Sequence, residues 1–169
     1  MRITRYPSIT EPQFFGCVSA FVDSLFGELN AAAAALRRLE SRTKGEAFAY
    51  EMELDAHRYG ALIVLDRWAT LAGAFAPHLE LSRDREILEQ APRRAAGAEG
   101  VLRSANELLD AADRYTPETV EGCLLAFQSL QVTFRQEARA AEHFAKLGPM
   151  LPDDYKEARR IFLEDLAAR

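Results

Sequence analysis

The sequence lacks the long apolar segments, and has few of the cysteines, that mark membrane and secreted proteins. Its longest apolar candidate, residues 61–76, is interrupted by Asp66 and Arg67 and falls short of the roughly 18 residues that span a bilayer. The first residues, MRITRYPSITEPQFF, contain no apolar segment of the kind found in secretory signals. We therefore expect a cytoplasmic protein with no membrane partner, in which the two cysteines stay reduced.

Positive charge is also scarce, because Asp and Glu outnumber Lys and Arg by 26 to 21 and the net charge is −5. A nucleic-acid-binding protein needs a clustered basic surface, so we expect no nucleic-acid partner. Only three of the basic residues are lysines. The bias toward arginine and alanine indicates a GC-rich bacterial genome.

Motifs for catalysis are missing as well. The sequence has no glycine-rich phosphate loop, no nucleophile elbow and no cysteine–histidine pattern with metal-ligand spacing. We therefore assign no catalytic residue and expect no cofactor.

The patterns that are present are helical. No segment alternates as a strand would, and apolar residues recur every three or four positions. In the first helix this pattern predicts a core-facing stripe of Phe14, Val18, Phe21, Leu25, Leu29, Ala32, Leu36 and Leu39. Thr116 before a proline is an N-cap signal, and Pro92 predicts a kink or a short break. The predicted helices span residues 10–43, 46–76, 82–115, 117–147 and 153–168, after an N-terminal arm of residues 1–9.

Four long helices joined by short turns predict one all-α domain over residues 1–169. We expect an antiparallel up-down four-helix bundle with an additional short C-terminal helix. In this arrangement Cys17 and Cys123 lie roughly 28 Å apart along the bundle axis. A disulfide needs Cα atoms within about 7 Å, so both cysteines are predicted to be buried core thiols.

The segment EMELDAHRYG, residues 51–60, comes closest to a chemical motif. Glu53 and His57 are four apart and face the same side of a helix, which makes them weak candidates for a metal pair. A bundle that holds two irons uses Glu-x-x-His pairs, but the residues three before His57 and His143 are Leu54 and Ala140.

The bundle model also separates the inward acids from this histidine. At 1.5 Å per residue, Glu28 should lie roughly 7 Å and Glu137 roughly 15 Å above His57 along the axis, whereas ligands of one metal lie within about 2.5 Å of it. We therefore predict no metal site and interpret His57 as a boundary histidine that is hydrogen-bonded to an acid.

Two charged neighbours follow from the same heights. Glu137 falls level with Arg67, Arg93 and Arg94, which predicts a partly buried ion pair with one of them. Glu53 falls level with Arg37 on the first helix.

A phosphorelay role is an alternative for His57. The segment HRYG, residues 57–60, resembles histidine phosphotransfer domains in its ingredients: a histidine on a bundle helix, a basic residue and a glycine. Their spacing differs from that family, and Tyr59 occupies the space where a partner would dock. Transfer of a phosphoryl group, or use of His57 for a metal or haem, is the resulting alternative function.

A second alternative is a small-ligand sensor with a pocket between the helices near Trp68. Aromatic residues at helical spacing are more often core residues. Of the remaining histidines, His78 follows Pro77 at a helix end and is expected in solvent, and His143 lies on a polar side of its helix.

Interaction with a protein is the function that the sequence favours. The C-terminal helix is amphipathic, and its apolar face needs a cover, which is its own bundle, a second copy or another protein. We predict a non-catalytic adaptor or regulator that binds a protein partner or forms a homodimer. The predicted partner-binding residues are Tyr155, Ile161, Phe162 and Leu166.

Overall fold

The structure is a computed structural model that describes residues 11–75, 82–146 and 153–167. These residues form α-helices and no β-strand, which confirms the all-α prediction. None of the helices in these ranges is both long enough and apolar enough to cross a membrane. The helices are α1 (Glu11–Leu39), α2 (Phe48–Phe75), α3 (Ser82–Glu89), α4 (Ala91–Ala111), α5 (Pro117–Thr133), α6 (Arg135–Lys146) and α7 (Asp153–Ala167).

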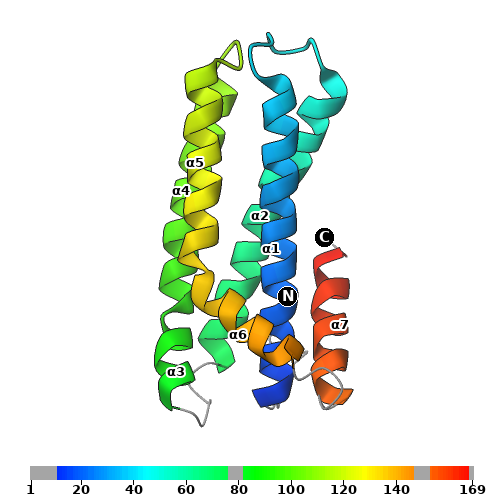
Figure 1. Cartoon of the computed structure of the whole chain (residues 1–169), viewed down its shortest axis with the longest axis vertical. Coiled ribbons are helices and arrows are strands. Elements are labelled where there is room, and N and C mark those ends of the chain that lie inside the picture. The colour runs from blue at the N-terminus through cyan, green and yellow to red at the C-terminus, as the bar shows by residue number, and fades with distance from the viewer. Residues whose placement is uncertain (1–10, 76–81, 147–152, 168–169) are drawn as a thin grey trace.

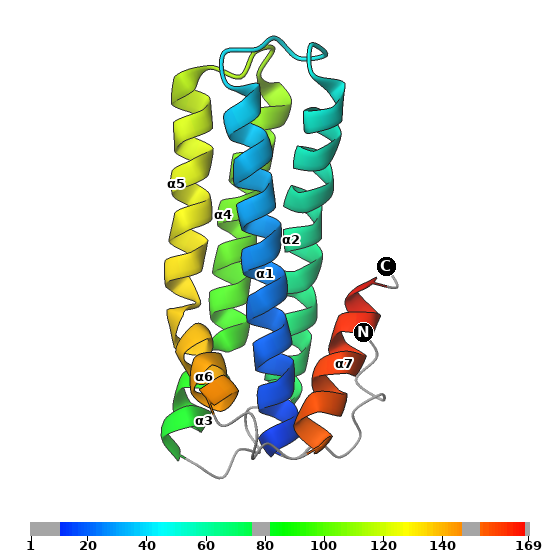
Figure 2. The same ribbon diagram turned by 45° about the vertical axis from the view of Figure 1, so that its right-hand side comes forward.

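The long helices α1, α2, α4 and α5 lie side by side, and successive members run in opposite directions (Figures 1 and 2). Their contacts are consistent with a helical bundle. The prediction of four helices plus one is nevertheless wrong, because two of the predicted long helices are each divided.

The first division separates α3 from α4 and was expected from Pro92, which stands in the first turn of α4. The second, between α5 and α6, was not expected. Phe134 leaves the helical conformation at this point, and its buried ring packs edge-on against Phe21 of α1. The apolar contact holds this aromatic residue in the core, and α6 then crosses α1 at an angle to α5 (Figure 1).

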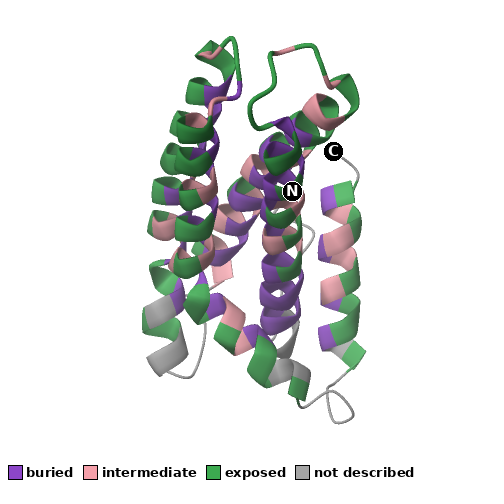
Figure 3. Cartoon of the chain, turned by 45° about the horizontal axis from the view of Figure 1, so that its top comes forward, coloured by how far each residue is buried: buried purple, intermediate pink, exposed green. Residues whose placement is uncertain are grey.

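Helix α1 is the central element of the core and contacts α2, α5, α6 and α7. Its lower half is buried almost all round (Figure 3). The stripe predicted for this helix is confirmed, since all its members are buried: Phe14, Val18, Phe21, Leu25, Leu29, Ala32, Leu36 and Leu39.

At the far end of the bundle, the turn after α1 and the turn before α5 are joined by backbone hydrogen bonds. Ser41 N–H donates to the Tyr115 carbonyl (2.7 Å), and Tyr115 N–H donates to the Arg42 carbonyl (2.9 Å). Ser41 has a φ of 68°, so α1 ends at Leu39 and not at residue 43 as predicted. The predicted N-cap of α5 is confirmed, because the Thr116 hydroxyl accepts from Thr119 N–H.

Candidate functional site

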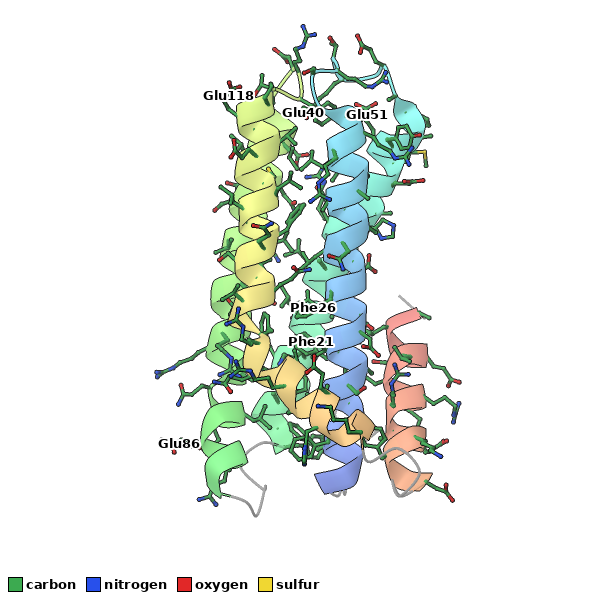
Figure 4. The ribbon with its side chains drawn as sticks, in the orientation of Figure 1. Phe21, Phe26, Glu40, Glu51, Glu86 and Glu118 are labelled. Carbon is green, nitrogen blue, oxygen red and sulfur yellow. The ribbon has the colours of Figure 1, made fainter. Side chains whose placement is uncertain are left out.

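The segment 51–60 lies in the first half of α2, and three of its polar residues, Glu51, His57 and Arg58, bond to other parts of the fold. Glu51 lies near the end of the bundle, beside the joined turns (Figure 4). One of its carboxylate oxygens accepts hydrogen bonds from Gly45 N–H (3.0 Å) and from the Tyr115 hydroxyl (2.9 Å). Burial and this hydrogen bond to Glu51 raise the pKa of Tyr115, so its hydroxyl remains a donor at neutral pH. Glu51 therefore ties α2 to both turns.

Arg58 is the most buried basic group of this segment, with 5% of its surface exposed. Its guanidinium donates to Asp55 Oδ1 (3.0 Å), to Asp110 Oδ1 (2.5 Å) and to the Asn106 carbonyl (3.3 Å). Burial by itself would lower the pKa of Arg58, but the hydrogen bonds to Asp110 and Asp55 outweigh it and raise that pKa. Arg58 is thus a charged link between α2 and α4.

His57 pairs with Glu28 of α1, with 2.6 Å between Nδ1 and Oε2. The predicted hydrogen bond to an acid is confirmed, but the predicted separation of roughly 7 Å is wrong. The turn spans residues 40–47, so Glu28 lies 11 residues before the end of α1 and His57 lies 9 residues after the start of α2. A difference of two residues is only about 3 Å of rise, which the side chains bridge.

Glu137 does not join this pair. It is fully buried on α6 and forms an ion pair with Arg94 of α4, one of the partners predicted from its height. Glu53, the other weak metal candidate, is exposed on α2. Within the described part of the chain, no group of three or more His, Cys, Asp or Glu side chains lies close enough together to hold a metal ion.

The remaining histidines are not part of this site. His143 is exposed on α6, and His78 lies outside the described residues. Gly60, which would have to clear space for a phosphorelay partner, is buried and faces the core.

Trp68 belongs to the aromatic centre of the core. Its indole stacks on Phe21 with 4.7 Å between ring centroids and an interplanar angle of 10°, and Phe14 lies beside it at 5.8 Å. The ring is completely buried, and its Nε1–H has no acceptor among the described residues. The indole thus fills the interior and does not line the groove described below.

Both cysteines are free, buried thiols, as predicted. The Cys17 thiol points at the Ala158 carbonyl of α7 (3.8 Å), and the Cys123 thiol at the Ala105 carbonyl of α4 (3.8 Å). Burial raises the pKa of Cys17 to about 12 and that of Cys123 to about 11, the latter against a smaller opposite effect of Arg58. Neither thiol is a reactive thiolate at neutral pH.

The predicted partner-binding residues of α7 are covered by the chain itself. Tyr155, Phe162 and Leu166 are buried and Ile161 is half-buried, because α7 packs along α1. Of the three possible covers for this apolar face, the structure shows the first, which is the bundle itself. These four side chains therefore do not form an open surface for a partner.

An exposed groove lies instead between α4 and α5. These helices are on the opposite side of the bundle from α7 (Figure 2). Its volume is about 680 Å³, and its lining is mostly apolar. A Cβ atom added at Gly97, Gly100 or Gly122 would meet no other atom within 4 Å, so the floor is open. The other lining residues include Val101, Ser104, Leu108 and Ala126.

Large apolar side chains are exposed on these two helices. Val101 and Leu108 on α4, and Leu125 and Val132 on α5, are 41–58% exposed. The other exposed large apolar residues among those described, Phe48, Met52 and Tyr59, lie on α2.

Sequence reasoning missed the groove, although one signal pointed to it. Glycine inside a helix costs about 1 kcal/mol relative to alanine, and α4 and α5 carry three glycines with no turn to explain them.

Comparisons with protein-family models, with curated proteins and with solved structures found no match to this chain.

Proposed function

We propose that this chain is a non-catalytic cytoplasmic adaptor or regulator that binds a protein partner through the groove between α4 and α5. In this proposal, α3 with α4 and α5 with α6 are two broken members of an up-down four-helix bundle. The bundle is a rigid support for the groove.

The exposed apolar groove is the observation that carries the proposal. Four of the seven exposed large apolar side chains among the described residues lie on α4 and α5. A shallow apolar groove lined by aliphatic side chains such as Val101 and Leu108 is the type of surface that accepts an amphipathic helix.

The polar contacts of α2 support a non-catalytic role. Arg58 is held by Asp55 and Asp110, and Glu51 is held by Gly45 and Tyr115. The bond of Arg58 to Asp55 lies within α2, and the other three join different segments of the fold, so these contacts favour a structural use of the charged residues.

Photo-crosslinking tests this proposal directly. A photoreactive amino acid replaces Leu125 beside the groove, and a matched variant carries it at Met52, which is similarly exposed on α2. In the source cells we expect a discrete adduct from position 125, with a yield several times that from position 52. Adducts from neither position, or mainly from position 52, would contradict a docking role for the groove.

A histidine-based activity is the second candidate, and the contact between His57 and Glu28 favours it. A carboxylate that binds one ring nitrogen can fix the tautomer and leave the other nitrogen for metal binding or phosphoryl transfer. Elemental analysis and an acid-labile phosphate assay on purified protein test it, with His57→Gln as the control. Bound metal or phosphate that is lost in this variant would favour the second candidate over the first.

A further inference from the structure

We infer that the occupant of the groove is a second copy of this chain, turned end over end by a two-fold axis perpendicular to the helices. This inference rests on the proposed function, because it names the partner of the same surface. Three features of α4 and α5 support it.

The first feature is that the surface contains both a groove and a ridge. Leu125 and Val132 are seven residues apart on α5 and therefore lie on one line along its exposed side. Gly122 and Ala126 line the adjacent groove. A two-fold axis perpendicular to the helices keeps the lateral order of this patch, so the ridge of Leu125 and Val132 on each copy packs against the same ridge of the other, and the two grooves face each other.

The second feature is the distribution of charge along this face. Arg93 on α4 and Arg135 at the start of α6 are exposed at the height of one end of the groove, while Glu107 and Glu118 are exposed at the height of the other. Glu118 lies at the end of the bundle that carries the joined turns (Figure 4).

The spacing of these charges suits an end-over-end pair. From the groove midpoint, halfway between Gly97 and Leu108, Arg93 lies about 14 Å in one direction and Glu107 about 7 Å in the other. Since α5 runs back alongside α4, Glu118 lies about 11 Å from the midpoint, on the side of Glu107. Turning one copy end over end places Arg93 opposite the partner copy's acids, whereas a parallel pair would place like charges together.

Other charged groups lie near this face. Glu121 is exposed on the acidic side, and Arg114 at the same end donates to the Ser41 carbonyl. Glu99 and Arg103 are near mid-height. Burial raises the pKa of Glu99, and the positive charge of Arg103 opposes this rise. On α3, Arg85 and Glu89 form an ion pair, and Glu86 lies beyond the end of the groove (Figure 4).

The third feature is the small size of the groove floor. Where Gly97, Gly100 and Gly122 stand, no side chain keeps a neighbouring helix away. The helices of two copies can therefore approach more closely than the usual 8–10 Å between axes. Close approach increases the number of apolar contacts per residue.

The test uses two charge-reversed forms of the full chain. The first carries Arg93→Glu and Arg135→Glu, and the second carries Glu107→Arg and Glu118→Arg. Sedimentation velocity at about 1–100 µM measures the mass of each form alone and of an equal mixture. Circular dichroism and melting curves establish that both forms are folded.

For the unaltered chain we expect twice the chain mass of 18.9 kDa at high concentration. Each reversed form should dissociate at least tenfold more readily, because like charges then face each other at both ends. The mixture should recover association, since a first-form copy and a second-form copy again place opposite charges together at both ends.

Three outcomes would overturn the inference. These are a monomer at every concentration, a dimer that neither reversed form weakens, and a mixture that does not recover association. If the unaltered chain is a monomer but position 125 crosslinks to a different protein, the inference fails while the proposed function stands. No crosslink from position 125 above the level of position 52 would remove both.

Discussion

The two sides of the bundle differ in what covers them. On one side α7 packs against α1. Gly16 lets these two helices approach so closely that a Cβ atom there would overlap the Tyr155 carbonyl oxygen. On the other side, α4 and α5 also carry glycines, but the space above Gly97, Gly100 and Gly122 is open. Helices on both sides lack side chains at selected positions, and only the first side has its neighbour within the chain.

This difference indicates what an uncovered glycine means in a helix. A glycine at a close contact offsets its cost in helix stability with apolar burial. A glycine over open space has no such compensation in the isolated chain. In the proposed function a partner supplies this compensation, which is why the groove and not α7 is the proposed docking surface.

Removing α7 should have the largest effect on stability. A chain that ends before Asp153 loses the burial of Tyr155, Phe162 and Leu166 and uncovers the α1 surface around Cys17. With about 1.5–3 kcal/mol for each large side chain, we expect a loss of at least about 4 kcal/mol in the free energy of unfolding. Urea denaturation measures it, and a loss below about 1 kcal/mol would mean that α7 is not part of the core.

The glycines of the two sides provide a matched pair of substitutions. Gly16→Ala should destabilise the protein by about 2 kcal/mol, because the added methyl group must push α7 away from α1. Gly122→Ala should stabilise the monomer by about 0.5–1 kcal/mol, because its methyl group enters open space and alanine favours helix.

Melting curves at low concentration compare these two variants, with Gly27→Ala as a control on α1, where the space is also open. Similar effects of Gly16→Ala and Gly122→Ala would show that the two sides do not differ as described.

The sequence predicted those features that depend on local patterns. The apolar spacing of α1 was enough to identify its buried face, and Thr116 with the proline after it was enough to place the start of α5. Both are set by neighbouring residues, which a sequence shows directly.

Features that depend on the path of a turn, or on which helix surfaces other helices cover, were missed. Nothing in the sequence around Ser41 signals a positive φ, so the turn was misplaced and the contact of His57 with Glu28 was missed. The groove was missed because apolar residues such as Leu125 and Leu130 look alike in the sequence, although one is exposed and the other is buried.

The two cysteines, one on each side of the bundle, should make the free energy of unfolding depend on pH above pH 9. The pKa of Cys17 under α7 rises from 9.0 to about 12, so the folded state keeps a proton that the unfolded chain loses above pH 9. The stability linked to this thiol is fully present below pH 9 and is lost as pH rises toward 12. The expected slope is about −1.4 kcal/mol per pH unit in this window.

Urea denaturation of the native chain and of Cys17→Ala between pH 8 and 11 measures this contribution as the difference between their slopes. Cys123, on the groove side, should give the same sign over a narrower window, because its pKa rises only to about 11. Equal slopes in the native chain and both alanine variants would contradict the inferred burial of the thiols.

The smallest change in stability is expected for Leu125→Ser beside the groove. This side chain is exposed, so its loss removes little burial, and the free energy of unfolding of the monomer should change by less than about 0.5 kcal/mol. Association should nevertheless weaken by about tenfold, because the apolar contact between the ridges of the two copies is then reduced. Sedimentation and urea denaturation on the same preparation separate the two effects. A variant that unfolds more easily yet associates normally would assign Leu125 to the core of its own chain and exclude it from the contact between copies.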